Sequence, residues 1–385
     1  MKTSGTEFQS KLPDIGTSIF TIMTKMANDY KAINLSQGFP DFDPPEELKK
    51  LVNHFIESGH NQYAPMQGVK ILRERISDKI RKLYGSYYNP NHEITITAGA
   101  TEALYTAITT VVKPGDEVII FEPAYDLYTP TVVASGGTPV YIPLKEPGFT
   151  IDWEMVNNSL TNRTKLIIIN SPHNPTGSVL NRTDIIKLEE LTADKDIFIL
   201  SDEVYEHILF DNNRHESISK SIKLAKKAFI ISSFGKTYHA TGWKVGYCAA
   251  PAYLTKEFRK IHQFVVFAVN TPVQYAYAEY ILNYEHYMEL NKFYQRKRDF
   301  FISMIKTSRF NLSPANGTYF QLLDYSGISG MNDIKFSEYL TKEVGAAVIP
   351  LSPFYSGIND RKLIRICFAK KDEVLAAAAE KLCKI

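Results

Sequence analysis

The stretch SSFGKTY at residues 232–238 directly follows the short apolar run Ala228 to Ile231, which is typical of a buried strand. Its lysine, Lys236, comes just past the expected strand end, among small hydroxyl and glycine residues that let a ligand approach closely. A lysine in such a place can form a Schiff base with a carbonyl compound. Most lysines are solvated surface charges, so this stretch alone also fits an ordinary surface position.

Short apolar runs of the same kind recur upstream, and helical or turn segments separate most of them. Apolar strands that alternate with helices are typical of a mainly parallel sheet covered by helices on both faces, so the sequence predicts an α/β fold. The expected strands are Ile94 to Thr97, Val118 to Phe121, Pro139 to Ile142, Leu166 to Ile169, Ile197 to Leu200 and Ala228 to Ile231, and the expected helices include Ser18 to Asn28, Pro45 to Ser58, Ala100 to Val112 and Tyr128 to Ser135.

The length of 385 residues exceeds what one small core needs and predicts two domains. Beyond about residue 275 the alternation gives way to long helical stretches such as Glu279 to Thr307, and a second mixed α/β region ends in Ala376 to Lys381. We therefore expect an N-terminal arm over 1–44 that joins the smaller domain, a large cofactor-binding domain over 45–285 and a small domain over 286–385.

The formal net charge of +2 leaves no electrostatic footprint for nucleic acid or a membrane, so small molecules and copies of the chain are the expected partners. Cys248, Cys367 and Cys383 are far apart and form neither a metal-ligand spacing nor a disulfide framework, so no metal is expected. Residues 1–13 are polar and lack the apolar stretch of a secretion signal, and no run approaches the roughly 20 apolar residues of a membrane span. These features predict a soluble protein of the reducing cytoplasm.

Small residues open a helix after the first expected strand of the sheet, where an open α/β fold binds its ligands. Gly99, Ala100 and Thr101 form this turn, and the free backbone N–H groups and the helix dipole there suit a phosphate. An ordinary tight turn between a strand and a helix explains the same residues. The GxGxxG pattern of dinucleotide-binding proteins is not present there.

Three further strand ends carry groups that a planar cofactor needs. Tyr125 can stack on a ring or pack in the core, and the two prolines around Asn174 exceed what a plain turn requires. Asp202 ends an apolar run, where a buried carboxylate is costly unless it is paired, although a helix N-cap is the alternative. Tyr205 lies on the same side of a helical turn as this acid.

Successive strands are therefore followed by a turn that could bind a phosphate, an aromatic side chain that could stack on a ring, an amide, an acid with a phenol, and a lysine. Pyridoxal 5′-phosphate needs all of these, because its aldehyde requires a lysine and its pyridine nitrogen requires a carboxylate to stay protonated. We expect this cofactor beyond the strand ends, held through Lys236.

Four segments resemble the class I/II aminotransferases of the fold-type I group, and the resemblance covers nearly the whole chain. These segments are NPTG at 174–177, SDEVY at 201–205, the stretch 233–246 and IRI at 364–366. The segments NLSQGFPDF at 34–42 and NQYAPMQG at 61–68 are similar to the kynurenine/glutamine aminotransferase branch, and within it to the bacterial methionine aminotransferases. The resemblance implies a mainly parallel seven-stranded sheet between helices, a smaller α/β domain and a transaminase activity.

The resemblance also implies roles for residues around the cofactor ring. Lys236 would bind the cofactor covalently and then move a proton between the substrate's Cα and the cofactor. Asp202 would pair with the pyridinium N–H through a charge-assisted bond. Asn174 and Tyr205 would bond the ring's phenolic oxygen, and Tyr125 would stack on the ring face.

The phosphate would bind the turn of Gly99, Ala100 and Thr101 through backbone N–H groups, together with Ser233 and Lys244. Most of the wider family has arginine at the last position. A lysine there is a point charge rather than a bidentate fork, so the phosphate geometry should differ. The kynurenine/glutamine branch also has lysine, which supports the narrower resemblance.

The substrate's α-carboxylate would bind Arg365, whose planar fork suits it, and the backbone of Gly38, with Asn174 beside them. Arg361 is the competing arginine, and the surrounding IRICFA favours Arg365. Tyr63 would reach the phosphate and substrate of the neighbouring subunit, which implies a two-fold homodimer with shared active sites.

Four apolar or aromatic residues could line the substrate pocket, although residues of these types more often pack in a protein core. No second arginine is clearly placed for a side-chain carboxylate, so we expect a transaminase that moves the amino group of an apolar, thioether or aromatic amino acid (methionine, glutamine, phenylalanine or kynurenine type) to a 2-oxo acid by a ping-pong mechanism. A cysteine-S-conjugate β-lyase on the same fold is the alternative, and a non-catalytic cofactor-binding regulator is a further one. The wall candidates are Ile19, Phe20, Phe267 and Tyr319.

Overall fold

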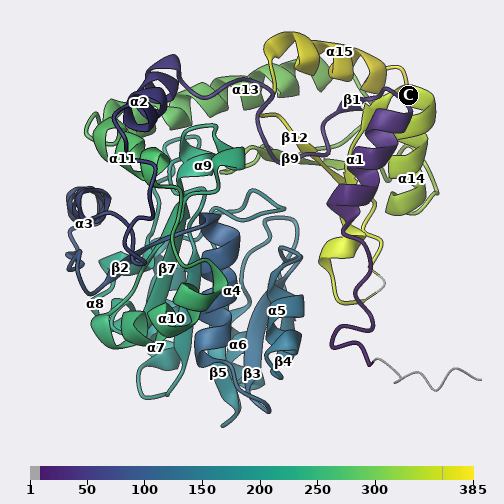
Figure 1. The fold of residues 1–385 in the computed structure, drawn as a ribbon. Coiled ribbons are helices and arrows are strands. Elements are labelled where there is room, and N and C mark those ends of the chain that lie inside the picture. Colours follow the sequence, from purple (N-terminus) through teal and green to yellow (C-terminus); the bar gives the residue numbers. More distant parts are fainter. Residues whose placement is uncertain (1–8, 358) are drawn as a thin grey trace, which may run out of the picture.

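A seven-stranded sheet forms the centre of the protein, which we describe from a computed structural model of residues 9–357 and 359–385 (Figure 1). The strand order is β2-β8-β7-β6-β5-β3-β4, and all neighbours are parallel except β8, which runs antiparallel to both β2 and β7. The strands are β2 (Ile94–Thr97), β3 (Glu117–Glu122), β4 (Thr138–Pro143), β5 (Thr164–Asn170), β6 (Phe198–Asp202), β7 (Ala228–Ser233) and β8 (Gly246–Ala249).

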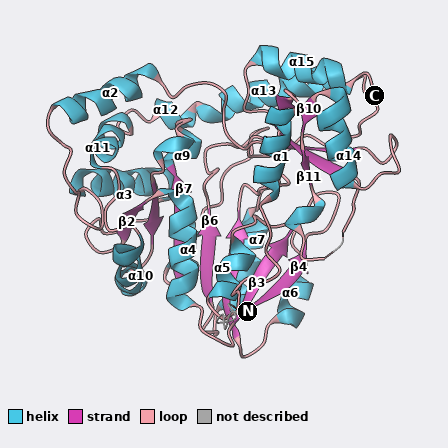
Figure 2. Ribbon diagram, turned by 45° about the vertical axis from the view of Figure 1, so that its right-hand side comes forward, coloured by secondary structure: helices cyan, strands magenta, loops and turns pink. Residues whose placement is uncertain are grey.

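Helices cover both faces of this sheet, as the magenta strands between cyan helices show in Figure 2. Because side chains alternate along a strand, Val118 and Ile120 of β3 pack into one buried cluster and Ile119 and Phe121 into the other. The helices of this part are α2 (Glu46–Glu57), α3 (Lys70–Tyr84), α4 (Gly99–Val111), α5 (Tyr128–Ala134), α6 (Trp153–Ser159), α7 (Arg182–Thr192), α8 (Ile222–Ala225), α9 (Phe234–Thr237), α10 (Ala252–Val265), α11 (Thr271–Tyr280) and α12 (Glu285–Met288).

A second core joins the two ends of the chain. The short strand β1 (Ile33–Asn34) pairs in parallel with β10 (Ala346–Ala347), and an antiparallel sheet has the order β11-β12-β9. In Figure 1, helix α1 (purple) lies beside α14 and α15 (yellow-green and yellow) near the C-terminus. The remaining elements are β9 (Phe320–Asp324), β11 (Ile349–Pro350), β12 (Leu363–Cys367), α1 (Ile19–Asp29), α13 (Leu290–Ile305), α14 (Asp333–Tyr339) and α15 (Asp372–Leu382).

The predicted mainly parallel seven-stranded sheet is confirmed, as are the predicted strands and helices that surround it. The prediction of one helical stretch over Glu279 to Thr307 is wrong, because the chain leaves α11 after Tyr280 and starts twice more, at α12 and α13. The side chain of Asn283 accepts a hydrogen bond from the backbone N–H of Glu285 at 3.1 Å, a local bond that competes with helix continuation. Helix α3 and strand β8 were not predicted. The predicted domain limits stay a prediction.

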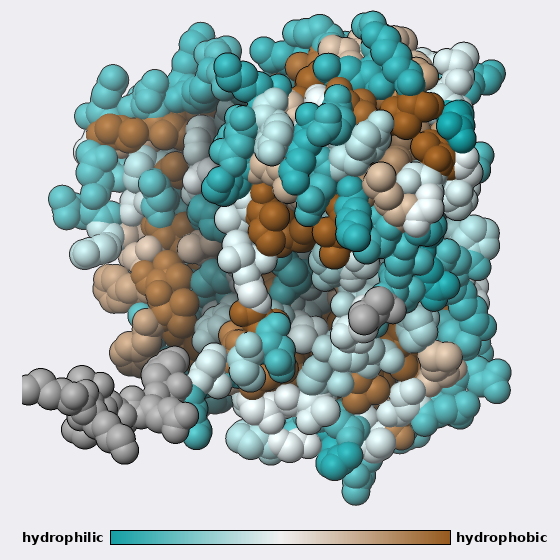
Figure 3. Space-filling model, turned by 90° about the vertical axis from the view of Figure 1, so that its right-hand side faces the viewer, coloured by the Kyte–Doolittle hydropathy of each residue, from teal (hydrophilic) through white to brown (hydrophobic). Residues whose placement is uncertain are grey.

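The face that carries α1 and α14 is largely hydrophilic, with brown hydrophobic patches scattered from top to bottom (Figure 3). Over the described ranges, no helix combines the length and the apolar character that a membrane crossing needs. The same ranges contain no cluster of side chains suited to a metal ion. Most of the segment 1–13, for which no secretion signal was predicted, lies outside the described residues.

Candidate active site

Lys236 lies in the short helix α9, immediately after the carboxyl end of β7. Its amine donates hydrogen bonds to the carbonyl oxygen of Gly38 at 3.2 Å and to the hydroxyl oxygen of Tyr319 at 3.0 Å. Burial lowers the pKa of this amine to about 8, so a large fraction is neutral at mildly alkaline pH. A neutral amine is the form that attacks a carbonyl or accepts a proton.

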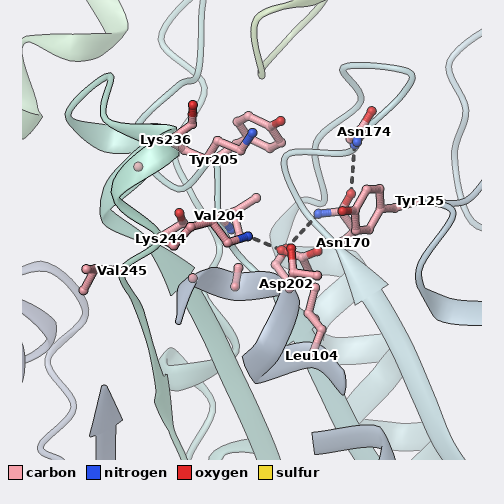
Figure 4. A pocket seen from close by; sticks show the side chains of 16 residues that line it. Leu104, Tyr125, Asn170, Asn174, Asp202, Val204, Tyr205, Lys236, Lys244 and Val245 are labelled. Carbon is pink, nitrogen blue, oxygen red and sulfur yellow. Dashed lines mark hydrogen bonds between the residues drawn. The ribbon is translucent and has the colours of Figure 1, made fainter. Parts of the chain in front are cut away.

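One cavity at the carboxyl ends of β5, β6 and β7 brings nearly all of the predicted cofactor residues together (Figure 4). These residues follow the ends of β2, β3, β5, β6 and β7 or precede the start of β8. They converge because those five strands run in the same direction and the antiparallel β8 starts at the edge of the sheet where they end. The predicted residues that line the cavity are Gly99, Ala100, Thr101, Tyr125, Asn174, Asp202, Tyr205, Ser233, Lys236 and Lys244.

The N-terminus of α4 forms a cationic end of this cavity. Gly99 has φ +76°, and a Cβ added there would lie 3.5 Å from the amine of Lys244. Lys244 itself has the left-handed φ of 53°, which is uncommon for a residue other than glycine. A helix N-terminus with free N–H groups beside a lysine is suited to bind a phosphate.

Asp202 is a buried acid on the floor of the cavity. Burial raises its pKa to about 6, although the Tyr128 hydroxyl donates a hydrogen bond to Oδ2 at 2.7 Å and lowers it in part. Among the described residues this carboxylate forms no ion pair within 4 Å. A ligand cation such as a protonated ring nitrogen would therefore stabilise it.

Hydrogen bonds of Asn170 join Asp202 to Asn174 (Figure 4), and Asn174 in turn contacts Arg365. The amide of Asn170 donates to the carbonyl oxygen of Asp202 at 2.9 Å and accepts from the backbone N–H of Asn174 at 2.8 Å. The side-chain oxygen of Asn174 accepts from Nη1 of Arg365 at 2.6 Å. This series of hydrogen bonds thus links the backbone of Asp202, the two amides and the guanidinium of Arg365.

Arg365 is 1% exposed, and its Nε has no hydrogen-bond partner among the described residues. Its guanidinium lies over the ring of Phe320, 3.8 Å from the centroid, and 5.2 Å from that of Phe20. Burial lowers its pKa to about 10, so it remains charged at neutral pH. A buried, charged guanidinium with an unused donor is suited to a planar carboxylate ligand.

The structure of one chain does not bring Tyr63 and Phe267 to this cavity. Tyr63 is 83% exposed and packs edge-on against Phe267, with ring centroids 5.2 Å apart. The prediction that Tyr63 serves a neighbouring subunit remains a prediction. Gly38 and Phe20, in contrast, lie beside Lys236 and Arg365 of the same chain.

Sequence reasoning missed Tyr128 and Asn170, which both contact Asp202. Tyr128 was predicted only as the start of a helix, and no pattern linked it to Asp202. Asn170 directly follows the expected strand Leu166 to Ile169, and an amide at the end of an apolar run needs a partner, which was the available signal. Tyr319, considered only as a pocket wall, contacts Lys236 directly.

Comparison with known proteins agrees with this geometry. Residues 30–382 match the family described as aminotransferase class I and II. The methionine aminotransferase of Escherichia coli strain K12 is 50% identical over 375 residues, 97% of each chain, and the kynurenine–oxoglutarate transaminase of Dictyostelium discoideum is 33% identical over 96% of this chain and 94% of its own. A solved Escherichia coli structure with a reported methionine aminotransferase function is 49% identical, with a TM-score of 0.96, over 99% of this chain and 100% of that one.

The matched range spans nearly all of the chain and includes every strand end that contributes to the cavity. The resemblance inferred from the motifs, including the branch that contains the kynurenine transaminases, is thereby confirmed. The chain belongs to the class I and II aminotransferases.

Proposed function

We propose that this aminotransferase moves the amino group of an apolar, thioether or aromatic L-amino acid to a 2-oxo acid, with pyridoxal 5′-phosphate as cofactor. The observation that carries the proposal is the arrangement of three groups around one cavity. The amine of Lys236, with its lowered pKa, and the buried carboxylate of Asp202 line the cavity, and the buried guanidinium of Arg365 lies next to it, bonded to the cavity-lining Asn174 at 2.6 Å. Each of them matches one functional group of the cofactor or of an amino acid.

The cavity fits the cofactor group by group. Lys236 would engage its aldehyde, and Asp202, a buried carboxylate without an ion-pair partner in the described chain, would face its ring nitrogen. The N-terminus of α4 with Lys244 would hold the phosphate, together with Ser233. When bound, pyridoxal 5′-phosphate supplies an electron sink for the electrons of a bond to the substrate's Cα.

Each residue around the cavity has a separate role in the proposed reaction. Arg365 binds the substrate's carboxylate and so fixes which bond of Cα points at Lys236. Lys236 takes the proton from Cα and later returns one, and its pKa near 8 suits both transfers. Asn174 and Tyr205 would hold the ring's oxygen, and Tyr125 would pack against the ring.

Several features support an apolar, thioether or aromatic substrate. Phe20 and Phe354 flank the guanidinium of Arg365, at 5.2 and 5.4 Å from their ring centroids, so the neighbourhood of the carboxylate site is aromatic. The relative with 50% identity is a methionine aminotransferase. Methionine is therefore the first donor to test, ahead of glutamine, phenylalanine and kynurenine.

The exposed pair of Tyr63 and Phe267 supports a homodimer in which each subunit completes the other's site. Cys248 and Cys367 are buried free thiols, which suits a reducing cytoplasm. The homodimer and the cytoplasmic location both belong to the proposed function.

A donor panel against several 2-oxo acids tests the substrate class. We expect a visible absorbance band when the purified protein binds pyridoxal 5′-phosphate, a change in this band on adding methionine, and 2-oxo product beyond one equivalent of enzyme only while an acceptor is present. Aspartate should be a poor donor, since none of the described residues that line the cavity is an arginine that could bind its side chain. Preference for aspartate would contradict the proposal. Release of pyruvate and ammonia from cysteine conjugates without an acceptor would favour the β-lyase alternative.

Replacing Tyr128 by phenylalanine is expected to move the acid limb of kcat/KM to higher pH. The Tyr128 hydroxyl stabilises the ionised Asp202, so its loss should raise the pKa of this acid further above its usual range. A hydrogen bond to a charged group is worth about 1.5–3 kcal/mol, so kcat/KM should fall about tenfold at pH 6 and little at pH 8.5.

The control for Tyr128 is Tyr141→Phe, which removes a hydroxyl of β4 that donates to Thr129 at 3.2 Å and not to Asp202. Its pH profile should match that of the wild type. An acid limb that stays in place in Tyr128→Phe would refute the role given to this hydroxyl.

A further inference from the structure

Tyr319 contacts Lys236 and Gly38, two groups whose relative positions matter for the proposed reaction. Its hydroxyl donates to the carbonyl oxygen of Gly38 at 2.6 Å and lies 3.0 Å from the amine of Lys236. The same carbonyl oxygen also accepts from Lys236 at 3.2 Å. The three groups therefore form a closed triangle of hydrogen bonds.

The number of protons that these three groups can donate determines where the lone pair of the Lys236 amine points. Burial raises the pKa of Tyr319 well above its usual range, so the group is a neutral phenol with one proton. That proton is used on Gly38, so toward Lys236 the phenol oxygen only accepts. A neutral amine has two N–H donors and one lone pair. Tyr319 and Gly38 take both donors, so the lone pair is left free and points away from them.

The backbone before Tyr319 is held in an uncommon conformation. Thr318 has φ +64°, a left-handed value that is rare for a β-branched residue. Its backbone N–H donates to Ile208 at 3.0 Å, and its hydroxyl accepts from the N–H of Phe320 at 3.1 Å. Gly317 leaves no room for a Cβ, which would lie 2.7 Å from Pro172. Such strain persists only where the surroundings over-determine it, and it clusters at functional sites.

This turn orients two consecutive side chains toward the site. The Tyr319 hydroxyl contacts Lys236, whereas the ring of Phe320 lies under Arg365 at 3.8 Å. The ring of Phe320 also leaves no room for a larger residue at position 38, since a Cβ added to Gly38 would lie 2.9 Å from that ring. The start of β9 thus connects the proton-transfer group with the carboxylate-binding group.

We propose that Tyr319 is a positioning residue that holds the free amine of Lys236 against Gly38, so that the lone pair of the amine faces the substrate's Cα. The inference rests on the proposed transamination and adds a residue to it. It assigns to Tyr319, directly before β9, the role of orienting the base during proton transfer from Cα to Nζ, after which Nζ would pass a proton on to the former carbonyl carbon of the bound cofactor.

The test is the Tyr319→Phe variant, which keeps the ring and its edge-on packing against Tyr205 at 5.1 Å. With methionine deuterated at Cα, we expect kcat to fall about tenfold, KM to change less than about twofold, and the isotope effect on kcat to rise, because a misplaced base slows proton transfer. A merely structural role would lower the amount of folded protein without changing the isotope effect.

A second readout uses the cofactor-free protein. Acetic anhydride labelling of Lys236, followed by peptide mass spectrometry, reports the neutral fraction of its amine, which should be half-maximal near pH 8 in the wild type. Tyr319→Phe removes an acceptor that stabilises the ammonium form, so the curve should move to lower pH and labelling at pH 7 should rise about threefold.

The matched control is Tyr294→Phe. Tyr294 belongs to the same aromatic cluster, with its ring 5.6 Å from that of Tyr319, but its hydroxyl bonds His239 at 3.0 Å. Its isotope effect and labelling curve should equal those of the wild type. A wild-type isotope effect in Tyr319→Phe, or equal changes in both variants, would overturn the inference. Failure of the wild-type protein itself to transaminate would instead count against the proposed function.

Discussion

Lys236→Ala is expected to lower kcat for transamination by about four orders of magnitude or more, because the base that moves the proton at Cα is lost. The neighbours Gly38 and Tyr319 have no basic nitrogen that could replace it. The phosphate cradle and Asp202 are left in place, so the variant should still bind pyridoxal 5′-phosphate without a covalent bond. Borohydride treatment followed by mass spectrometry should find the cofactor fixed to the wild type and absent from the variant.

Lys244→Ala is the matched control for this prediction, since it removes the other lysine of the cavity. It should weaken cofactor binding, through the loss of a charge near the N-terminus of α4, and still allow covalent fixation by borohydride. Fixation of the cofactor to Lys236→Ala at the wild-type level would assign the covalent bond to another lysine.

Arg365→Ala is expected to reduce kcat/KM for methionine about 10³-fold, mainly through KM. Two charge-assisted hydrogen bonds to the carboxylate contribute about 1.5–3 kcal/mol each, and 1.4 kcal/mol corresponds to a factor of ten. The change also leaves the side-chain oxygen of Asn174 without its donor at 2.6 Å. Steady-state kinetics with increasing methionine measures the effect, and thermal denaturation checks that the variant is folded.

Arg361→Ala provides the comparison, because Arg361 is the neighbouring arginine that sequence alone left in competition. It is 48% exposed at its side chain and lies 3.6 Å from Glu146 in a surface ion pair. Such pairs are worth little, so kcat/KM should stay within about twofold of the wild type. A large loss in Arg361→Ala together with a small one in Arg365→Ala would reverse the two assignments.

The groups that directly follow an apolar run could be predicted from the sequence. Asp202 and Lys236 each come within a few residues of a strand end, and the rule that parallel strands present their carboxyl ends together brings them to one edge. The motif resemblance then supplied the branch of the family, which the relatives confirm.

Contacts between distant parts of the chain could not be predicted in this way. Tyr128 is 74 residues from Asp202, and Lys79 is 127 residues from Glu206, with which it forms a buried ion pair at 2.6 Å. No short-range pattern encodes such pairs, since each depends on how two helices or loops pack in three dimensions. The helix breaks around Asn283 were missed because a polar side chain that caps its own chain outweighs the helical pattern locally.

The parallel pairing of β1 with β10 affects the order in which the parts of the active site come together during synthesis of the chain. Ser36, which follows β1, accepts a hydrogen bond from Arg365 across 329 residues of sequence. At a synthesis rate of about 5–20 residues per second, the N-terminal segment waits on the order of 15–65 s for these partners. A nascent chain therefore carries Lys236 well before Arg365, so the group proposed to hold the substrate's carboxylate is made long after the group proposed to bind the cofactor.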